Sequence, residues 1–306
     1  MTLKQLTYVI TAADTGNITE AAGKLYISQP SLTSAIHELE AEYGITIFSR
    51  SKKGITLTPE GDEFLGYARQ VLEQAYLMEE RYKGKSSGKN RFCVSSQHYS
   101  FVVEAFVELL RLSGGEKYEF HMRETQTYAI IEDVTRLRSE IGVLYLNSYN
   151  ETVIRKTLKD NNLAFYPLFT ASPHVFIGKG NPLAQKEELT LEDLRPYPRL
   201  SYEQGSHNAF YFSEEILSTE DCDKDIVVCD RASLFNMLVG LDGYTICSGV
   251  ISEKLNGPNI VARPLKVNDS MQIGYILPKD IRPSALTAEY IRILKKLTAK
   301  SDAHMV

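Results

Sequence analysis

Residues 17–40 read NITEAAGKLYISQPSLTSAIHELE, and this stretch decides the fold of the N-terminal part of the chain. Ala21 and Ala22 fall on the inward side of a short helical pattern, and their small side chains allow a second helix to approach closely. After a short break, Ser28 is suited to cap a new helix and Pro30 to stand in its first turn. The stretch therefore predicts two helices joined by a tight turn.

The second of these predicted helices has an apolar side and a polar side. Leu32, Ile36 and Leu39 have the spacing of residues that face a core. The outer side and the helix start carry short side chains, most of them with hydrogen-bonding groups: Ser28, Gln29, Pro30, Ser31, Thr33, Ser34 and His37. Such a face, at the N-terminal end of the second helix of the motif, can read base edges in the major groove of DNA. A helical bundle with a solvated polar face would have the same pattern.

The segment that follows favours the DNA-binding interpretation. Residues 44–61 read GITIFSRSKKGITLTPEG, in which two runs rich in β-branched residues, 45–48 and 55–57, are separated by a short connection. That connection carries three basic residues, Arg50, Lys52 and Lys53. The pattern predicts a β-hairpin with a basic tip, which is the wing of a winged helix-turn-helix domain.

A long helix and a linker are predicted next. Residues 59–82 begin with a proline and an acidic first turn, both of which are typical of helix starts. Their apolar residues recur at alternating steps of four and three, which is the pattern of a seam for a partner helix: Phe64, Ala68, Val71, Ala75, Met78 and Tyr82. Residues 83–90 are polar and rich in glycine and serine, as in a flexible linker.

From residue 91 onward the pattern changes to alternating strands and helices with short connections. Strands are predicted at three places, 91–96, 117–127 and 140–147, with amphipathic helices between them. A second run of the same alternation is predicted to start at residue 163 and to extend to a final helix at 284–298. Such alternation indicates parallel sheets in an α/β fold.

Polar residues follow several of the predicted strands, at the end where open α/β sheets bind their ligands. In the first half of this region they are Ser95, Ser96, Gln97, His98, Thr125, Gln126 and Thr127. In the second half they are Ser201, Glu203, Gln204, Arg231 and Ser248. Together they predict a site for a small polar or anionic ligand, with Arg231 as the partner of a carboxylate. Each cluster by itself could equally cap the helix that it precedes.

The bulk composition limits the alternatives. The 306 residues are 43% hydrophobic and 24% charged, with a formal net charge of −5, so a nucleic-acid contact must be confined to a small part of the chain. The sequence has neither the pattern of a signal peptide nor an apolar run of membrane-spanning length, from which we expect a cytoplasmic protein without a membrane partner. We find no catalytic motif, metal-ligand spacing or cofactor fingerprint, and therefore expect neither an enzyme nor a bound cofactor.

Residues 1–65 resemble the DNA-binding domain of LysR-type transcriptional regulators. The matching residues are Leu6, Ala21, Ala22, Leu25, Ser28, Gln29, Pro30, Leu32, Ile36, Leu39, Glu40, Gly44, Phe48, Arg50, Leu57, Thr58 and Gly61. The resemblance implies that the helix that starts after Ser28, the third helix of such domains, enters the major groove, with Gln29, Pro30, Ser31, Thr33 and Ser34 facing the bases. It also implies that Arg50 contacts a phosphate and that the long helix pairs with its twin. The chain departs from many relatives in having Ser34, Ala35 and His37 at the middle of the recognition helix, which leaves the operator sequence open.

The rest of the chain is also similar to this family, whose effector domain resembles periplasmic binding proteins. The resemblance implies a winged helix-turn-helix domain at 1–58, a dimerisation helix at 59–82, a flexible linker at 83–90 and a two-lobed α/β effector domain at 91–306. One lobe would comprise 91–164 and 266–306 and the other 165–265, with the ligand in the cleft between them. Expected partners are a pseudo-palindromic site on double-stranded DNA, a small-molecule effector and further copies of this chain in a homodimer or homotetramer. RNA polymerase is an additional candidate partner.

Three segments point to a narrower group within the family. SSQHY, IGVLYLN and DRASL are similar to segments of Gram-positive regulators of cysteine and methionine metabolism, which implies a sulfur amino acid or its precursor as the effector. Two other functions stay open at this point. Cys222 and Cys229 could form a redox pair on the same scaffold, or the chain could be a small-molecule-binding protein or an enzyme.

Overall fold

The structure is a computed structural model that describes residues 1–51, 54–83, 90–205 and 210–299. The chain divides into two compact units, Met1–Gly88 and Lys89–Val306, which are described separately below. In the described part of the chain, no helix is both long enough and apolar enough to cross a membrane.

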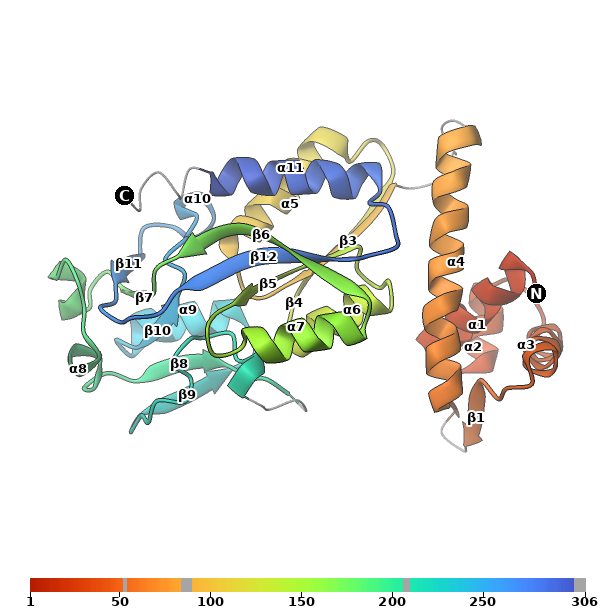
Figure 1. Ribbon diagram of the computed structural model, residues 1–306, viewed down its shortest axis with the longest axis horizontal. Coiled ribbons are helices and arrows are strands. Elements are labelled where there is room, and N and C mark those ends of the chain that lie inside the picture. The colour runs from red at the N-terminus through yellow and green to blue at the C-terminus, as the bar shows by residue number, and fades with distance from the viewer. Residues whose placement is uncertain (52–53, 84–89, 206–209, 300–306) are drawn as a thin grey trace. The chain divides into compact units, whose positions relative to one another are not determined.

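The N-terminal unit is a helix-turn-helix followed by a two-stranded wing and a long helix. Its elements are α1 (Leu3–Thr15), α2 (Ile18–Lys24), α3 (Gln29–Tyr43), β1 (Phe48–Ser51), β2 (Gly54–Leu57) and α4 (Pro59–Lys83) (Figure 1). Side-chain caps fix the helix starts: Asn17 accepts hydrogen bonds from the Thr19 and Glu20 amides, and Ser28 accepts one from the Ser31 amide. The expected cap at Ser28 is therefore confirmed.

A small apolar core holds this unit together. Its buried members come from α1, α2, α3, the segment before the wing, and α4, and include Leu6, Val9, Ala12, Ala21, Leu32, Leu39, Ile47 and Leu65. The start of α4 lies tightly against the segment that enters the wing, because a Cβ atom at Gly61 would be 2.1 Å from the Ile47 carbonyl oxygen. Only glycine allows this close approach of the two backbones.

The C-terminal unit contains two five-stranded sheets, and the sheet of the first lobe has the order β4-β3-β5-β12-β6. These strands are β3 (Asn90–Ser96), β4 (Tyr118–Glu124), β5 (Ile141–Leu146), β6 (Leu163–Ala171) and β12 (Met271–Pro278). The first three run parallel, and β12 is antiparallel to both of its neighbours. Two helices pack on each other over one face, α5 (Ser100–Ser113) and α11 (Ala285–Thr298), while the other face is covered by α6 (Thr127–Thr135) and α7 (Glu151–Asp160) (Figure 1).

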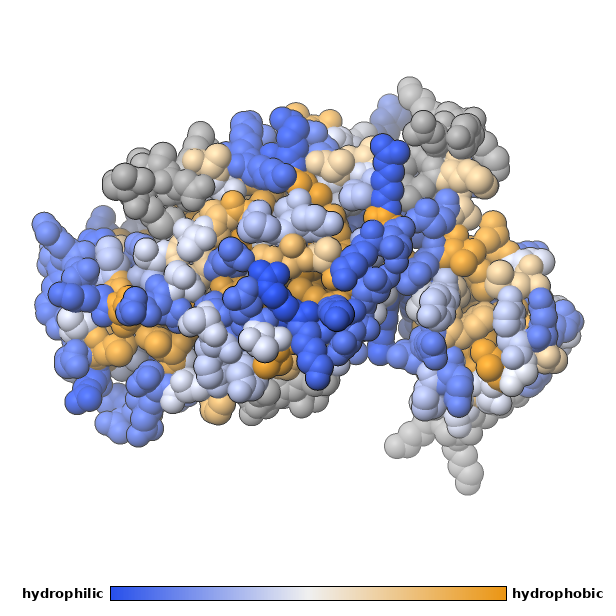
Figure 2. All heavy atoms as spheres, in the orientation of Figure 1, coloured by the Kyte–Doolittle hydropathy of each residue, from blue (hydrophilic) through white to orange (hydrophobic). Residues whose placement is uncertain are grey.

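The sheet of the second lobe has the order β11-β7-β10-β8-β9. Its strands are β7 (His174–Gly178), β8 (Arg199–Tyr202), β9 (Asp225–Val228), β10 (Tyr244–Cys247) and β11 (Ile260–Pro264). Helix α9 (Arg231–Gly240) packs on one face through Leu234 and Leu238. Short helical turns complete the lobe: η1 (Pro182–Gln185), α8 (Leu191–Leu194), η2 (Phe210–Phe212) and α10 (Glu253–Asn256). In Figure 2 hydrophilic residues cover most of the visible face of the C-terminal unit, and apolar residues show between them near β6 and β12.

The chain crosses between the lobes later than the sequence suggested. We expected a crossing near Phe165, but β6 continues to Ala171 and pairs with β12 along its whole length. The boundary between the two lobes therefore lies at residues 172–173, because the hydrogen bonds to β12 hold the whole of β6 in the first sheet. The return crossing lies between the end of β11 at Pro264 and the start of β12 at Met271. Both sheets are also mixed rather than purely parallel, since each contains antiparallel pairs.

Candidate DNA-reading helix and effector cleft

Helix α3 presents the expected polar face to solvent. Of the seven residues predicted for DNA contact on α3 and its cap, six are exposed, Ser28, Gln29, Pro30, Ser31, Ser34 and His37, and Thr33 is half-buried. Several of the side chains are held by local hydrogen bonds: Ser28 Oγ lies 2.8 Å from Ser31 Oγ, and Ser34 Oγ donates to Glu38 over 3.1 Å. The exposed groups at the start of α3 form one continuous strip beside its N-terminal amides, which is the geometry that base reading requires.

Glu40 fixes the wing to this helix. Its Oε1 atom accepts hydrogen bonds from the amides of Ile47 and Phe48, at 2.7 and 3.2 Å, just where the chain enters β1. Arg50 lies in β1 opposite Ile55 on β2, and Lys52 and Lys53 lie outside the described residues. The position of the wing beside α3 thus depends on a carboxylate whose role sequence reasoning missed, because its partners are backbone amides.

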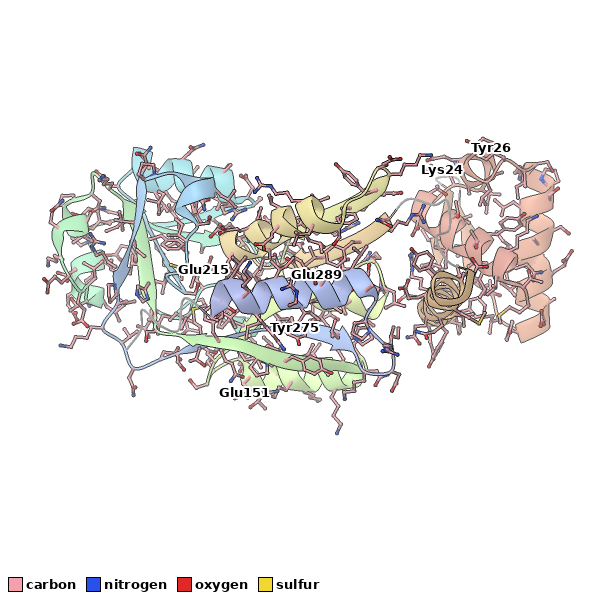
Figure 3. The ribbon with its side chains drawn as sticks, turned by 90° about the horizontal axis from the view of Figure 1, so that it is seen from above. Lys24, Tyr26, Glu151, Glu215, Tyr275 and Glu289 are labelled. Carbon is pink, nitrogen blue, oxygen red and sulfur yellow. The ribbon has the colours of Figure 1, made fainter. Side chains whose placement is uncertain are left out.

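Tyr26 is a further residue that sequence reasoning missed. It stands in the turn between α2 and α3 with φ +55°, and 94% of its surface is exposed (Figure 3, where Lys24 and Tyr26 are labelled). An aromatic ring in this position contributes little to the core of its own unit. An aromatic side chain two residues before the cap of the reading helix was the available signal.

The predicted seam on α4 is only partly available to a partner. Phe64, Ala68 and Leu72 pack into the core of the N-terminal unit itself. Farther along the helix, Val71 and Met78 stand one heptad apart and are 39% and 59% exposed. The start of the predicted seam is therefore occupied by the core of this unit, and the side chain of Tyr82 lies outside the described residues.

In the first lobe, several of the predicted ligand-binding residues bond to each other or to nearby side chains. Ser95 Oγ donates to Asp133 over 2.7 Å. The side-chain Nε2 of Gln97 donates to Thr127 Oγ1 over 2.6 Å. The side-chain Oε1 of Gln97 accepts from the backbone amide of Tyr145 and from the Tyr99 hydroxyl. These interactions leave Ser95, Gln97 and Thr127 as structural residues of the strand ends. Ser96 differs, because its buried Oγ has no hydrogen-bond partner among the described residues.

The centre of the cleft is a pair of buried glutamates that we did not predict. Glu214 accepts hydrogen bonds from the His98 amide at 2.6 Å and pairs with His98 Nδ1 at 2.7 Å. The neighbouring Glu215 accepts one from the Tyr202 amide at 2.9 Å, and the His98 and Tyr202 rings stack with their centroids 3.8 Å apart. Figure 3 shows Glu215 inside the C-terminal unit, in contrast to Glu151 on the outer helix α7. The two carboxylates join the lobes, since His98 follows β3 and Tyr202 ends β8.

Further side-chain pairs close the cleft around a cavity of about 40 Å³. Arg231, at the start of α9, forms an ion pair of 2.8 Å with Glu124 at the end of β4, so its predicted carboxylate partner is provided by the chain itself. Gln126 Nε2 donates to Glu203 Oε1 over 3.4 Å across the same gap, beside the half-buried Thr125. Ser248 Oγ lines the cavity and accepts from the Val250 amide. A cavity of this size holds little more than a water molecule, so a metabolite can enter only if the lobes move apart.

Burial and the repulsion between neighbouring carboxylates determine which groups of the cleft are ionised. Burial, together with the adjacent Glu214, raises the pKa of Glu215 to about 8. Burial also raises the pKa of Glu124, despite the opposing effect of Arg231. For His98, burial lowers the pKa but the Glu214 charge and hydrogen bond outweigh it, so the pKa is raised. A proton is thus retained near neutral pH at Glu215, because two adjacent buried carboxylates cannot both ionise without a large cost.

The cysteines do not support the redox alternative. Cys222 precedes β9 and Cys229 follows it, and this strand, Asp225–Val228, rises about 3.3 Å per residue. The two Cα atoms are therefore held well beyond the ~7 Å limit for a disulfide. The hydrogen bond and the charge of nearby Glu203 raise the pKa of the Cys229 thiol, which opposes formation of the reactive thiolate.

Two family models match the chain, and they divide it as the structure does. Residues 3–62 match the bacterial regulatory helix-turn-helix protein of the lysR family, and residues 93–299 match the LysR substrate-binding domain. The chain belongs to the LysR family. These matches confirm the expected fold class and the expectation that this LysR-family chain is a DNA-binding transcription regulator and not an enzyme.

Individual relatives agree with this assignment. The chain is 43% identical over 89 residues to the regulator TfdS of Cupriavidus pinatubonensis, an alignment that covers 29% of this chain and 30% of that relative's length. It is 26% identical over 245 residues to the regulator AlsR of Bacillus subtilis, covering 79% of this chain and 77% of AlsR. A full-length variant of OxyR from Pseudomonas aeruginosa has the same fold, with a TM-score of 0.66, 21% identity and coverage of 97% and 94% of the two chains.

Proposed function

We propose that this chain regulates transcription in the cytoplasm by binding a pseudo-palindromic operator as a homodimer or homotetramer, in response to a small-molecule effector. The observation that supports this most directly is the exposed polar strip on α3, with the wing attached beside it through Glu40. Two copies that pair along the exposed residues of α4 would present two such strips to successive turns of a duplex. RNA polymerase would be the next partner in the same process.

The two classes of DNA contact are expected to respond differently to mutation. Gln29→Ala removes a side chain of the reading face, so it should relax base preference at particular positions at a cost of roughly 1–3 kcal/mol. Arg50→Ala removes a phosphate contact, so it should weaken binding to all sequences and reduce the salt slope by about one unit. Binding titrations on specific and random duplexes at several salt concentrations measure both effects. Identical behaviour of the two variants would refute this division of roles.

For the effector, we propose a zwitterionic amino acid or a close precursor, with a sulfur-containing compound as the first choice. The support comes from the ion pair between Arg231 and Glu124, which joins the two lobes across the cleft. When the lobes separate, an amino acid can replace this pair, its carboxylate on Arg231 and its ammonium on Glu124. Such a ligand would change the angle between the lobes only by binding one arrangement more tightly than the other.

Thermal-shift measurements test the effector proposal. The full-length protein is screened against amino acids and their sulfur-containing or O-acylated precursors, and a ligand that raises the melting temperature is tested again on Arg231→Gln. We expect the shift to disappear in this variant, and to remain in Arg155→Gln, whose arginine forms an ion pair on the exposed surface of α7. If no zwitterion shifts the melting temperature while operator binding is intact, the effector class is wrong and the regulator assignment is unaffected.

A further inference from the structure

The second lobe contains a larger hollow on the side of its sheet that faces away from α9. Along β8 and β9 the side chains alternate: Leu200 and Val228 pack with α9, while Ser201 and Val227 line the hollow. The segment 210–218 forms the opposite wall. The hollow has a volume of about 320 Å³, which is at the lower end of the range for small-molecule sites.

An unpaired acceptor atom points to a ligand in this hollow. Gln204, which follows β8, lines the hollow and is only 9% exposed. Its Nε2 atom donates to the Tyr202 carbonyl at 3.0 Å, whereas its buried Oε1 atom has no hydrogen-bond partner among the described residues. A buried acceptor without a donor is unfavourable, so the site favours a molecule that brings a hydrogen-bond donor.

The charges around the hollow favour a cation. Three of its lining residues, Glu203, Glu215 and Asp225, carry carboxyl groups, and Glu215 is 6% exposed. Arg199 is the one arginine or lysine among the described lining residues, and its guanidinium already binds Asp225 at 3.0 Å and the Glu220 carbonyl at 2.8 Å. The described lining therefore offers an anion only a guanidinium that already binds other groups. A positively charged group can bind to the carboxyl groups and to Gln204 Oε1.

We propose that this hollow is a second ligand site, distinct from the cleft between the lobes, which binds a small metabolite through a primary ammonium group held by Gln204 Oε1 and the Glu215 carboxyl group. An ammonium group has three donors, enough to satisfy both oxygen acceptors at once. The hydroxyls of Ser201, Ser213 and Ser218 line the same hollow and provide partners for polar atoms in the rest of the molecule.

The two sites share part of their walls. Tyr202 and Glu215 line both the hollow and the small cavity in the cleft, and Glu215 lies next to Glu214, which holds His98 of the first lobe. An ammonium group at Glu215 would favour its ionised form. Occupation of the hollow would thereby change the charge at the contact between the lobes.

Calorimetric titration of the full-length protein tests the proposal with three probes: putrescine, ethanolamine and L-alaninamide. N,N′-diacetylputrescine, which lacks the ammonium groups, and succinate, which is an anion, serve as negative probes. The variants are Gln204→Leu, which removes the acceptor at nearly constant volume, and Ser218→Tyr, which fills the hollow. Gln185→Leu is the matched control, because Gln185 is an exposed glutamine in η1 of the same lobe.

We expect at least one amine to bind, with affinity reduced about tenfold or more in Gln204→Leu, since hydrogen bonds to charged groups are the stronger ones. Ser218→Tyr should abolish binding, and Gln185→Leu should leave it unchanged. If Gln204→Leu fails to fold, as judged by circular dichroism, the result with Ser218→Tyr decides. Failure of all three amines to bind at millimolar concentration, or binding that both variants retain, would overturn the proposal. Operator binding is measured in parallel, so that a failure of this second site is distinguished from a failure of the regulator assignment.

Discussion

Glu40→Ala is expected to abolish specific operator binding while the C-terminal unit remains folded. The Glu40 carboxylate accepts the amides of Ile47 and Phe48 at the entrance to the wing, in a partly buried position. Without it, each of these amides loses its acceptor, at a cost of about 1–3 kcal/mol per group. The wing would then no longer be held beside α3, and the two DNA contacts could not be made together.

Glu42→Ala is the matched control for this prediction. Glu42 lies on the same helix, but it is exposed and its carboxylate binds the terminal amine of Met1. Binding titrations with operator DNA, together with thermal unfolding of each variant, separate lost affinity from lost folding of the N-terminal unit. Operator affinity in Glu40→Ala that equals that of Glu42→Ala would show that the wing is positioned by something other than this carboxylate.

The stability of the C-terminal unit is expected to fall as the pH rises through neutral. The folded-state pKa of Glu215 is raised from 4.5 to about 8, so between these values the folded protein binds a proton that the unfolded chain has released. Stability therefore decreases with pH across this window. The pKa of His98 is raised above 6.5 in the folded protein. The contribution of His98 to the stability is therefore complete below pH 6.5, and it is lost as the pH rises through the folded-state pKa. Both groups act in the same direction.

Glu214→Gln should flatten this pH dependence, because the Glu214 charge contributes to the raised pKa of both neighbours. The comparison is the melting temperature of the C-terminal unit at pH 6 and pH 9 in the wild type, in this variant and in the control Glu188→Gln, which alters an exposed residue elsewhere in the second lobe. A wild-type melting temperature that rises with pH, or a slope that Glu214→Gln leaves intact, would contradict the assignment of this dependence to the cleft.

Sequence alone was sufficient where the interactions that shape the chain are local. Asn17 and Ser28 cap their helices through amides two or three residues away, and such spacings can be read directly. The inward residues of α3, Leu32, Ile36 and Leu39, follow from helical periodicity, and all three are buried. For the same reason the helix-turn-helix, the wing and the alternation of strands and helices could be predicted from the chain.

The cleft depended on contacts between residues far apart in the sequence. Glu214 and His98 are 116 positions apart, and the segment that carries Glu214 and Glu215 reads as an ordinary connection between two strands. The sequence also could not predict the partner of Arg231, because a ligand carboxylate and the Glu124 carboxylate are both suitable partners for its guanidinium.

Local sequence patterns indicate which face of a helix or strand is apolar and where that helix or strand begins and ends. The sequence by itself therefore determined the type of each domain and the reading face of α3. Only the tertiary structure decided that β6 remains in the first sheet, that two glutamates are buried together between the lobes, and that Gln204 keeps an unpaired oxygen in a hollow. The physical reason is that strand pairing, burial and the satisfaction of polar groups depend on which distant segments meet.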